Sequence, residues 1–459
     1  MKVIKVAVGI VLALMLLLSP GAVGQRVILN RDGLGNAFSV ESIAVATRGL
    51  TTATDPIYFA VSTDVERWPA AAHGGDANVV VYVKKDKQGN DAIYASVLSS
   101  GQTDPLPYPI SSFAGNCAHP AIAYQAASGW FVIVYVCDAT AILAQVFQPA
   151  TEVVGPIVTI SADDGTPNAD PAVVCNQTAG ACLVAFQYDL SRVKGAYVDV
   201  DSAGITHISS VYDLSDGIVT GRPYLAWGRE MGTYLVAYSE QHSAGEILPG
   251  YTHVIDQDDP LVTIKYLHPS TPAVPSDFSP SGYDALVSDA VFDPCTQKFL
   301  ISFDYDAAGD GSNFDVWATV VHPTDPINFT PIPIADTPVS EHNSAISFVS
   351  SGHQTPSCGS MDRLLIGYIN EVLGLMAVEL RGDSNPSNPV YTYDAANQHL
   401  LIENHTNMYH INEVRIAHGP GDKRYMLVYD IHHLSSGDED IWGKFIGLLD
   451  LVYLPLVLR

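Results

Sequence analysis

The feature that most constrains this chain is a strand-like segment that recurs seven times. Each copy is a short apolar run around a central aromatic residue, as in "WFVIVYV" around Tyr135 and "YLVAYSE" around Tyr238. Runs of apolar, β-branched and aromatic residues predict β-strands, and their even recurrence predicts a repeat architecture. The central aromatic residues follow one another at steps of 51 to 65 residues and are Tyr82, Tyr135, Phe186, Tyr238, Phe303, Tyr368 and Tyr429.

Each copy is flanked by two further segments that predict strands. The segment before it begins with a proline in the first four copies, and the segment after it carries a small and an apolar residue two positions apart, such as Ala144 and Val146. Because only short turns separate the three strands, we expect them to be antiparallel. A fourth, outer strand fits the variable segment before the next unit, for example "GPIVTIS" at 155–161.

With these strands the chain resembles secreted bacterial β-propellers made of degenerate blades of the form P-A-x-A-Y … F-L-V-x-Y … D-I-x-A-x-x-V. The resemblance covers roughly residues 37 to 448. It implies an all-β fold, a seven-bladed β-propeller of antiparallel four-stranded blades, with an array of β-sandwiches as the alternative. It is almost silent on function, because propellers carry binding sites and enzymes alike.

The two ends of the chain bear on the closure of this ring and on its location. The last unit has little chain left for an outer strand, so a strand from residues 37–49 is expected to supply it and to close the ring. Residues 1–24 predict a secretory signal peptide, with a retained membrane anchor as the alternative. The rest predicts one propeller domain at 25–448 and an apolar tail at 449–459, which serves in surface sorting or packs as a final strand.

The composition narrows the class of partner. The chain has 49 acidic and 22 basic residues, a formal net charge of −27. Such a charge repels nucleic acid and anionic membrane surfaces. We therefore expect a secreted, extracellular monomer that binds no nucleic acid and whose mature chain does not insert into a membrane, although the tail could hold it at the cell surface.

Six cysteines, an even number in an exported chain, predict disulfides. In two pairs the cysteines stand at equal distances from the middle of a turn, so they lie opposite each other across a hairpin. In the third pair they stand in the first turns of neighbouring units. The predicted pairs are Cys117–Cys137, Cys175–Cys182 and Cys295–Cys358.

The residues directly before the first strands are the candidates for a functional site. In a propeller, the loop before the first strand and the loop between the second and third strands share one face, which surrounds the channel mouth. The residues there differ from unit to unit, unlike the repeated strand aromatics. Solvated strand starts are the alternative reading of Trp68, His119, Asp170, Arg222, Ser288, Asn343 and Glu413.

Six of these residues are predicted to form one ligand-binding surface: Trp68, His119, Asp170, Arg222, Asn343 and Glu413. The surface would take an extracellular glycan or protein, with Trp68 offering a flat apolar face. One alternative is a carbohydrate-active hydrolase or lyase that uses Asp170 and Glu413 as its carboxylates. Another is a structural component of the cell envelope. Because no common hydrolase motif occurs, the enzyme is the weaker hypothesis.

An acidic loop, "DYDAAGDGSNFD" at 304–315, is a candidate metal site. Hard oxygen ligands at short spacing around glycines suit Ca²⁺, although the spacing departs from the EF-hand pattern. Polar turns between strands are the alternative, and no other cofactor is expected. The candidate ligands are Asp304, Asp306, Asp310 and Asp315.

Overall fold

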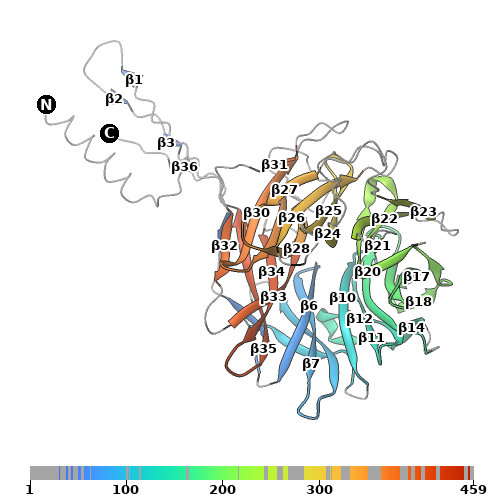
Figure 1. Ribbon diagram of the computed structural model, residues 1–459. Helices are drawn as coiled ribbons and strands as arrows, with labels where there is room; N and C mark the ends of the chain where they lie inside the picture. The colour runs from blue at the N-terminus through green and yellow to red at the C-terminus, as the bar shows by residue number, and fades with distance from the viewer. Residues whose placement is uncertain are drawn as a thin grey trace.

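The computed structural model is a closed ring of seven antiparallel β-sheets arranged around a central axis (Figure 1). It describes residues 56–448 except for internal segments, of which the longest are 267–283, 322–330, 350–362 and 383–390, together with short strands between 30 and 52 and at 453–454. The predicted seven-bladed β-propeller is therefore confirmed. In the part of the chain that is described, no helix is long and apolar enough to cross a membrane.

Each blade is a meander of three long strands and one or two shorter outer strands. The first strands, nearest the axis, are β6 (Val65–Gly74), β10 (Cys117–Gln125), β15 (Asn168–Cys175), β20 (Ile218–Gly228), β24 (Asp284–Asp293), β28 (Glu341–Val349) and β33 (Tyr409–Gly419). The second strands are β7 (Ala77–Lys85), β11 (Trp130–Cys137), β16 (Ala181–Tyr188), β21 (Thr233–Gln241), β25 (Lys298–Asp306), β29 (Arg363–Asn370) and β34 (Arg424–His433). The third strands are β8 (Asp91–Ser99), β12 (Ala141–Gln148), β17 (Arg192–Asp201), β22 (Ile247–Ile255), β26 (Phe314–Val321), β30 (Gly374–Gly382) and β35 (Glu439–Leu448).

The outer strands are shorter and less regular than the other three. They are β9 (Leu106–Pro109), β13 (Val153–Val154) with β14 (Val158–Ser161), β18 (Gly204–Ile208) with β19 (Tyr212–Asp213), β23 (Val262–Tyr266), β27 (Pro331–Ala335) and β31 (Tyr391–Tyr393) with β32 (Leu400–Asn404). Two short 3₁₀ turns lie between strands: η1 (Pro149–Thr151) between β12 and β13, and η2 (Arg229–Met231) between β20 and β21.

The core lies between neighbouring blades, whose sheets pack face to face. In β11 all eight residues are buried, because a blade stands on either side of it. Val132 of this strand belongs to one apolar cluster with blade 3, and Ile133 to another with blade 1. The repeated aromatic position bridges strands within a blade, since the Tyr135 hydroxyl donates to Gln145 Oε1 at 2.5 Å. The aromatic repeat is therefore structural.

The ring closes through strands from the N-terminal part of the chain, but not through the expected residues. Strand β5 (Ile57–Ala60) and strand β4 (Leu50–Thr52) pair with β35 of the last blade. The prediction that residues 37–49 form the closing strand is wrong. This segment contains β2 (Phe38–Ser39), which pairs with β1 (Asn30–Arg31), and β3 (Ile43–Ala44), which pairs with β36 (Tyr453–Leu454) of the tail.

Two predicted disulfides are confirmed. Cys117 and Cys137 face each other in register on β10 and β11, and Cys175 and Cys182 do so on β15 and β16. Cys295 is also disulfide-bonded. The sixth cysteine, Cys358, lies outside the described residues, so its pairing with Cys295 stays a prediction.

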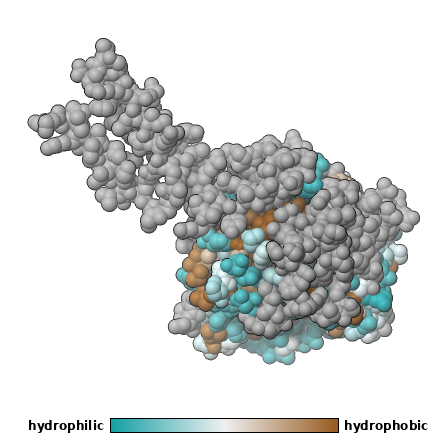
Figure 2. Space-filling view, turned by 45° about the horizontal axis from the view of Figure 1, so that its top comes forward, coloured by the Kyte–Doolittle hydropathy of each residue, from teal (hydrophilic) through white to brown (hydrophobic). Residues whose placement is uncertain are grey.

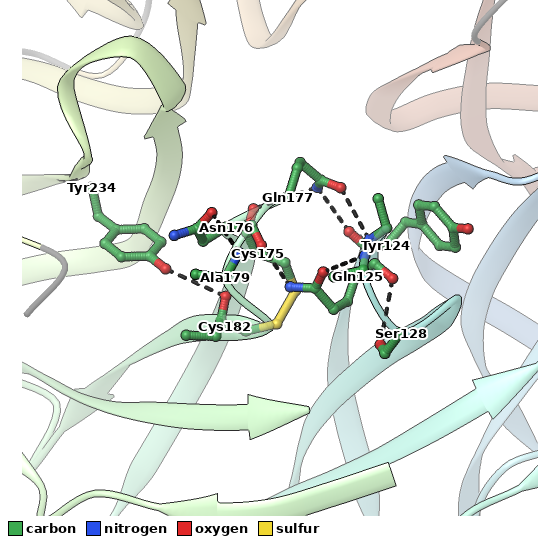
Figure 3. The surroundings of a disulfide bond; sticks show 12 residues. Tyr124, Gln125, Ser128, Cys175, Asn176, Gln177, Ala179, Cys182 and Tyr234 are labelled. Carbon is green, nitrogen blue, oxygen red and sulfur yellow. Dashed lines mark hydrogen bonds between the residues drawn. A yellow bond between two sulfur atoms is a disulfide. The ribbon is translucent and has the colours of Figure 1, made fainter. Parts of the chain in front are cut away.

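The second of these disulfides closes a turn that links two blades (Figure 3). Gln177, in this turn of blade 3, donates from Nε2 to the backbone oxygen of Tyr124 in blade 2 at 2.8 Å. In return, Gln125 of blade 2 donates to the backbone oxygen of Asn176 at 2.6 Å. These bonds lie at the opposite end of the strands from the channel mouth, so this turn holds the blades together rather than forming part of the candidate site.

Candidate functional site

Every first strand carries a β-bulge, and the predicted channel-mouth residues lie at these bulges. The register between first and second strand slips at the same place in all seven blades, for example between Arg67 and Ala70 in β6. The expectation that these residues precede the strands is therefore wrong, because pairing continues past them with Arg67 opposite Val83. The proline at this position occurs at a bulge, where the missing N–H breaks no ladder hydrogen bond.

The bulges hold several side chains in an unusual backbone conformation. Trp68, His119, Asp170 and Asn343 have φ values of 55°, 49°, 46° and 52°, in the left-handed region. A residue with a Cβ atom loses about 1–2 kcal/mol there. In blade 4 the left-handed residue is Gly221, next to Arg222. Because a bulge re-aims the side chain it carries, this shared irregularity can turn side chains of different blades towards the axis at a common level.

On one side of the mouth, four side chains contact one another in a row: Arg67, Trp68, His119 and Asp170. The imidazole of His119 lies parallel to the Trp68 ring at 4.1 Å, and its Nδ1 lies 2.8 Å from Asp170 Oδ1. The Arg67 guanidinium lies 3.9 Å from the centre of the same Trp68 ring. Two planar groups this close to one ring would collide on the same face, so they cover opposite faces. The expectation that Trp68 offers a free apolar face is therefore wrong.

The other side of the mouth is bridged by a salt bridge between blades that are not neighbours. Arg222 Nη1 of blade 4 lies 3.1 Å from Glu413 Oε1 of blade 7. Arg415, two residues after Glu413, bonds to the same oxygen. All three side chains are mostly buried, with exposed fractions of 14% to 19%. Two guanidinium groups thus share one carboxylate at the axis.

Asn343 connects the remaining blades to this centre. Its side-chain amide donates to the backbone oxygen of Asn412 in blade 7 at 2.7 Å, and its backbone N–H donates to Asp304 Oδ2 of blade 5 at 2.8 Å. Ser288, the bulge residue of blade 5, is buried and donates to the backbone oxygen of Leu286 at 3.3 Å. Six of the seven predicted residues thus meet around the axis, and Ser288 turns into its own strand.

The charges at the mouth set the protonation of its carboxylates. Burial alone would raise the pKa of Asp170, but the His119 hydrogen bond and the nearby positive charges outweigh it and lower that pKa. Burial and the charge of Glu413 raise the pKa of Asp430 well above the usual range of an aspartate. Burial likewise raises the pKa of Asp289. Asp170 and Glu413, the carboxylates proposed for an enzyme, are instead both held by side chains of the protein, Asp170 by His119 and Glu413 by two arginines.

No family model matches this chain, and no curated protein matches it. Similar solved structures include the intramolecular trans-sialidase from Ruminococcus gnavus, at 10% identity over 84% of this chain and 94% of that chain with a TM-score of 0.46. The β-propeller domain of the trilobed protease from Pyrococcus furiosus is similar at 8% identity over 83% and 95%, with a TM-score of 0.44. These likenesses concern the propeller fold and carry no argument about ligand or reaction.

The candidate calcium ligands are only partly brought together. Asp304 and Asp306 lie on the same face of β25, whereas Asp315 is paired with Tyr305 and so points to the other face. Asp310 lies outside the described residues. Among the residues that are described, no three His, Cys, Asp or Glu side chains are grouped so that they could hold a metal ion. The calcium site stays a prediction.

Added Ca²⁺ is expected to raise the melting temperature if this loop binds it, because a ligand that binds the folded state stabilises it by mass action. Burial and the charges of Asp336, Glu341 and Asp306 raise the pKa of Asp315 to about 6, and a cation would relieve that repulsion. The double variant Asp306→Ala, Asp310→Ala should abolish the rise. Thermal unfolding with Ca²⁺ and with chelator tests this, and identical curves would leave only a polar turn.

Proposed function

We propose that the protein recognises an extracellular ligand, a glycan or a protein, at the channel mouth. The observation that carries the proposal is the bulge in all seven first strands, which directs side chains of different chemistry to one level of the axis. Left-handed residues other than glycine cost stability, and such strain is concentrated at functional sites. An extracellular location is supported by the disulfides, which persist in oxidising compartments.

A binding role is better supported than catalysis. A glycosidase of the usual kind needs a protonated carboxylic acid beside the bond it cleaves and a second carboxylate. Asp170 has a lowered pKa and is bound to His119, so it is ionised at neutral pH. Glu413 is already shared by two arginines. Asp430, the carboxyl group with the raised pKa, is only 4% exposed and accepts a hydrogen bond from the Glu413 backbone.

The test is binding by the full chain on a glycan array and to a displayed peptide library, together with a broad screen for glycoside hydrolysis. Arg222→Ala is expected to weaken the selected interaction at least about tenfold, a loss of about 1.4 kcal/mol. Arg229→Ala is the matched control, because Arg229 is exposed in η2 of the same blade. The proposal fails if Arg222→Ala and Glu413→Gln, both shown by circular dichroism to be folded, bind as the parent does, or if hydrolysis is found that Glu413→Gln abolishes.

A further inference from the structure

Exposed apolar side chains are distributed unevenly between the two faces of the ring. Among the described residues, six of the twelve large apolar side chains that are exposed lie in turns between second and third strands, at the start of a first strand, or in the loop that leads into one. These places share the face of the channel mouth. We call this set the apolar rim. On the opposite face, the described turns between first and second strands carry none, and the connections between third and outer strands carry Leu106 and Val153. The apolar rim consists of Val61, Leu190, Ile218, Val372, Leu373 and Leu434.

Leu190 is held out in solvent by a strained turn. It follows Asp189 in the turn between β16 and β17, where φ is 53° at Asp189 and 50° at Leu190. The Leu190 side chain is 57% exposed. A turn with two left-handed residues favours Asn and Gly, and a bulky residue in that conformation is an outlier. Neither folding nor solubility gains from leucine here, which points to a role in contact with another molecule.

The same turn in the neighbouring blade provides a comparison. Asp138 and Ala139 have φ values of 52° and 59° in the turn between β11 and β12. Both turns are closed by the same hydrogen bond, from Thr140 to Cys137 at 3.2 Å in one and from Ser191 to Tyr188 at 3.2 Å in the other. The two turns therefore differ mainly in the side chain at the second position.

Leu190 does not stand alone at the surface. The backbone N–H of Val219 in blade 4 donates to the backbone oxygen of Ser191 in blade 3 at 2.7 Å. Leu190 and Ile218 are the residues next to these two in sequence, and Ile218 is 55% exposed. Figure 2 shows hydrophobic residues exposed in separate spots between hydrophilic ones. Leu190 and Ile218 thus flank a hydrogen bond at the boundary between blades 3 and 4, and Ile218 lies four residues before Arg222 of the mouth.

The turns that carry the apolar rim are acidic. The turns after the second strands of blades 3, 6 and 7, which carry Leu190, Val372, Leu373 and Leu434, each contain one acidic residue and no lysine or arginine. These acidic residues are Asp189, Glu371 and Asp438. The whole chain carries a net charge of −27. A surface of this kind complements one that presents apolar side chains next to basic ones.

We propose that the ligand is a protein, which docks on the apolar rim through a surface that carries apolar side chains beside lysines and arginines. This inference rests on the proposed function, because it places the partner over the channel mouth. Glycan recognition is less well supported, since both faces of Trp68 are covered by side chains of the protein itself. A protein partner needs no deep pocket, only a broad face with a few apolar anchors.

The probe is a phage-displayed library of random dodecapeptides, selected on the full chain at low salt. Selected peptides should combine apolar residues with lysine or arginine, and their affinity should fall as salt rises. Leu190→Gly should reduce peptide affinity at least about tenfold while leaving the melting temperature unchanged or higher, because glycine adopts left-handed φ without strain. Ala139→Gly is the matched control, with the same effect on the turn and no effect on binding. Ile218→Ser should also weaken binding.

Two results would overturn the inference. One is a set of peptides that bind Leu190→Gly and Ile218→Ser as tightly as the parent. The other is that a glycan on the array binds in a way that depends on Arg222, while no peptide can be selected. That result would support the proposed function and exclude a protein as the ligand. A third result would separate the two proposals. If peptide affinity falls in Leu190→Gly but not in Arg222→Ala, the apolar rim is the binding surface and the channel mouth is not.

Discussion

Replacing Arg415 with methionine should lower the free energy of unfolding by about 3 kcal/mol, the lower end of the range for removing one partner of a buried ion pair. Burial opposes the charge of Arg415, but the carboxylates around it, with Glu413 first, outweigh this and raise its pKa. Without it, Glu413 keeps only Arg222, and the buried Asp289 and Asp430 lose the positive charge of Arg415, with which both interact. Chemical denaturation followed by tyrosine and tryptophan fluorescence measures the change.

The double variant Arg415→Met, Glu413→Gln separates charge from packing. If the loss comes from an uncompensated carboxylate, neutralising that carboxylate should restore part of the stability, and the two changes should not be additive. Arg229→Met serves as the surface control and should stay within about 0.5 kcal/mol of the parent. A loss for Arg415→Met no larger than that of the control would mean that the arginines are not essential for holding the mouth together.

Removing the disulfide between Cys117 and Cys137 by a double change to alanine should cost about 3 kcal/mol. The bond closes a loop with a sequence separation of 20, and the loss of chain entropy in the unfolded state grows with loop length. The bond also lies at the start of β10, two residues before His119, so it restrains a strand that carries a mouth residue. Urea unfolding of the parent and the double variant provides the comparison.

The shorter disulfide gives a matched comparison for this prediction. Cys175 and Cys182 have a sequence separation of only 7, so the same change there should cost less, about 2.5 kcal/mol. If the Cys175–Cys182 variant is the less stable of the two, loop entropy does not explain the difference. The disulfide then also stabilises the hydrogen bonds that Gln125 and Gln177 make between blades 2 and 3. A Cys117–Cys137 variant as stable as the parent would contradict the prediction outright.

The features that repeat could be predicted from the sequence, because each copy meets the same environment. In blades 1, 2 and 4 the central tyrosine (Tyr82, Tyr135 and Tyr238) forms a hydrogen bond with a polar side chain on the third strand of its own blade. Selection for an aromatic residue at this position leaves a regular repeat in the sequence. The pairing of Cys117 with Cys137 followed from equal distances to one turn. Both are local relations, and local relations are what a sequence pattern expresses most directly.

Relations between distant residues were harder to predict. The closing strand β5 has only four residues, and its pairing with β35 depends on the geometry of the whole ring. One further feature of the site could have been predicted from the sequence but was not. Arg415 stands two positions after Glu413, and side chains two positions apart in a strand return to the same face. By contrast, nothing in the pair Asp189-Leu190 indicates a left-handed turn, so that strain is visible only in the structure.

The closure of the ring by β5 also has a consequence for how the protein folds. Residues near the beginning of the chain must wait for β35, near its end, before their strand acquires a partner. A chain that emerges N-terminus first therefore carries an unpaired edge for most of its synthesis, and such edges invite pairing with other chains. Contacts between residues this distant in sequence also slow folding. We expect the last blade to assemble late, after the six blades before it have formed a scaffold on which both ends of the sheet can meet.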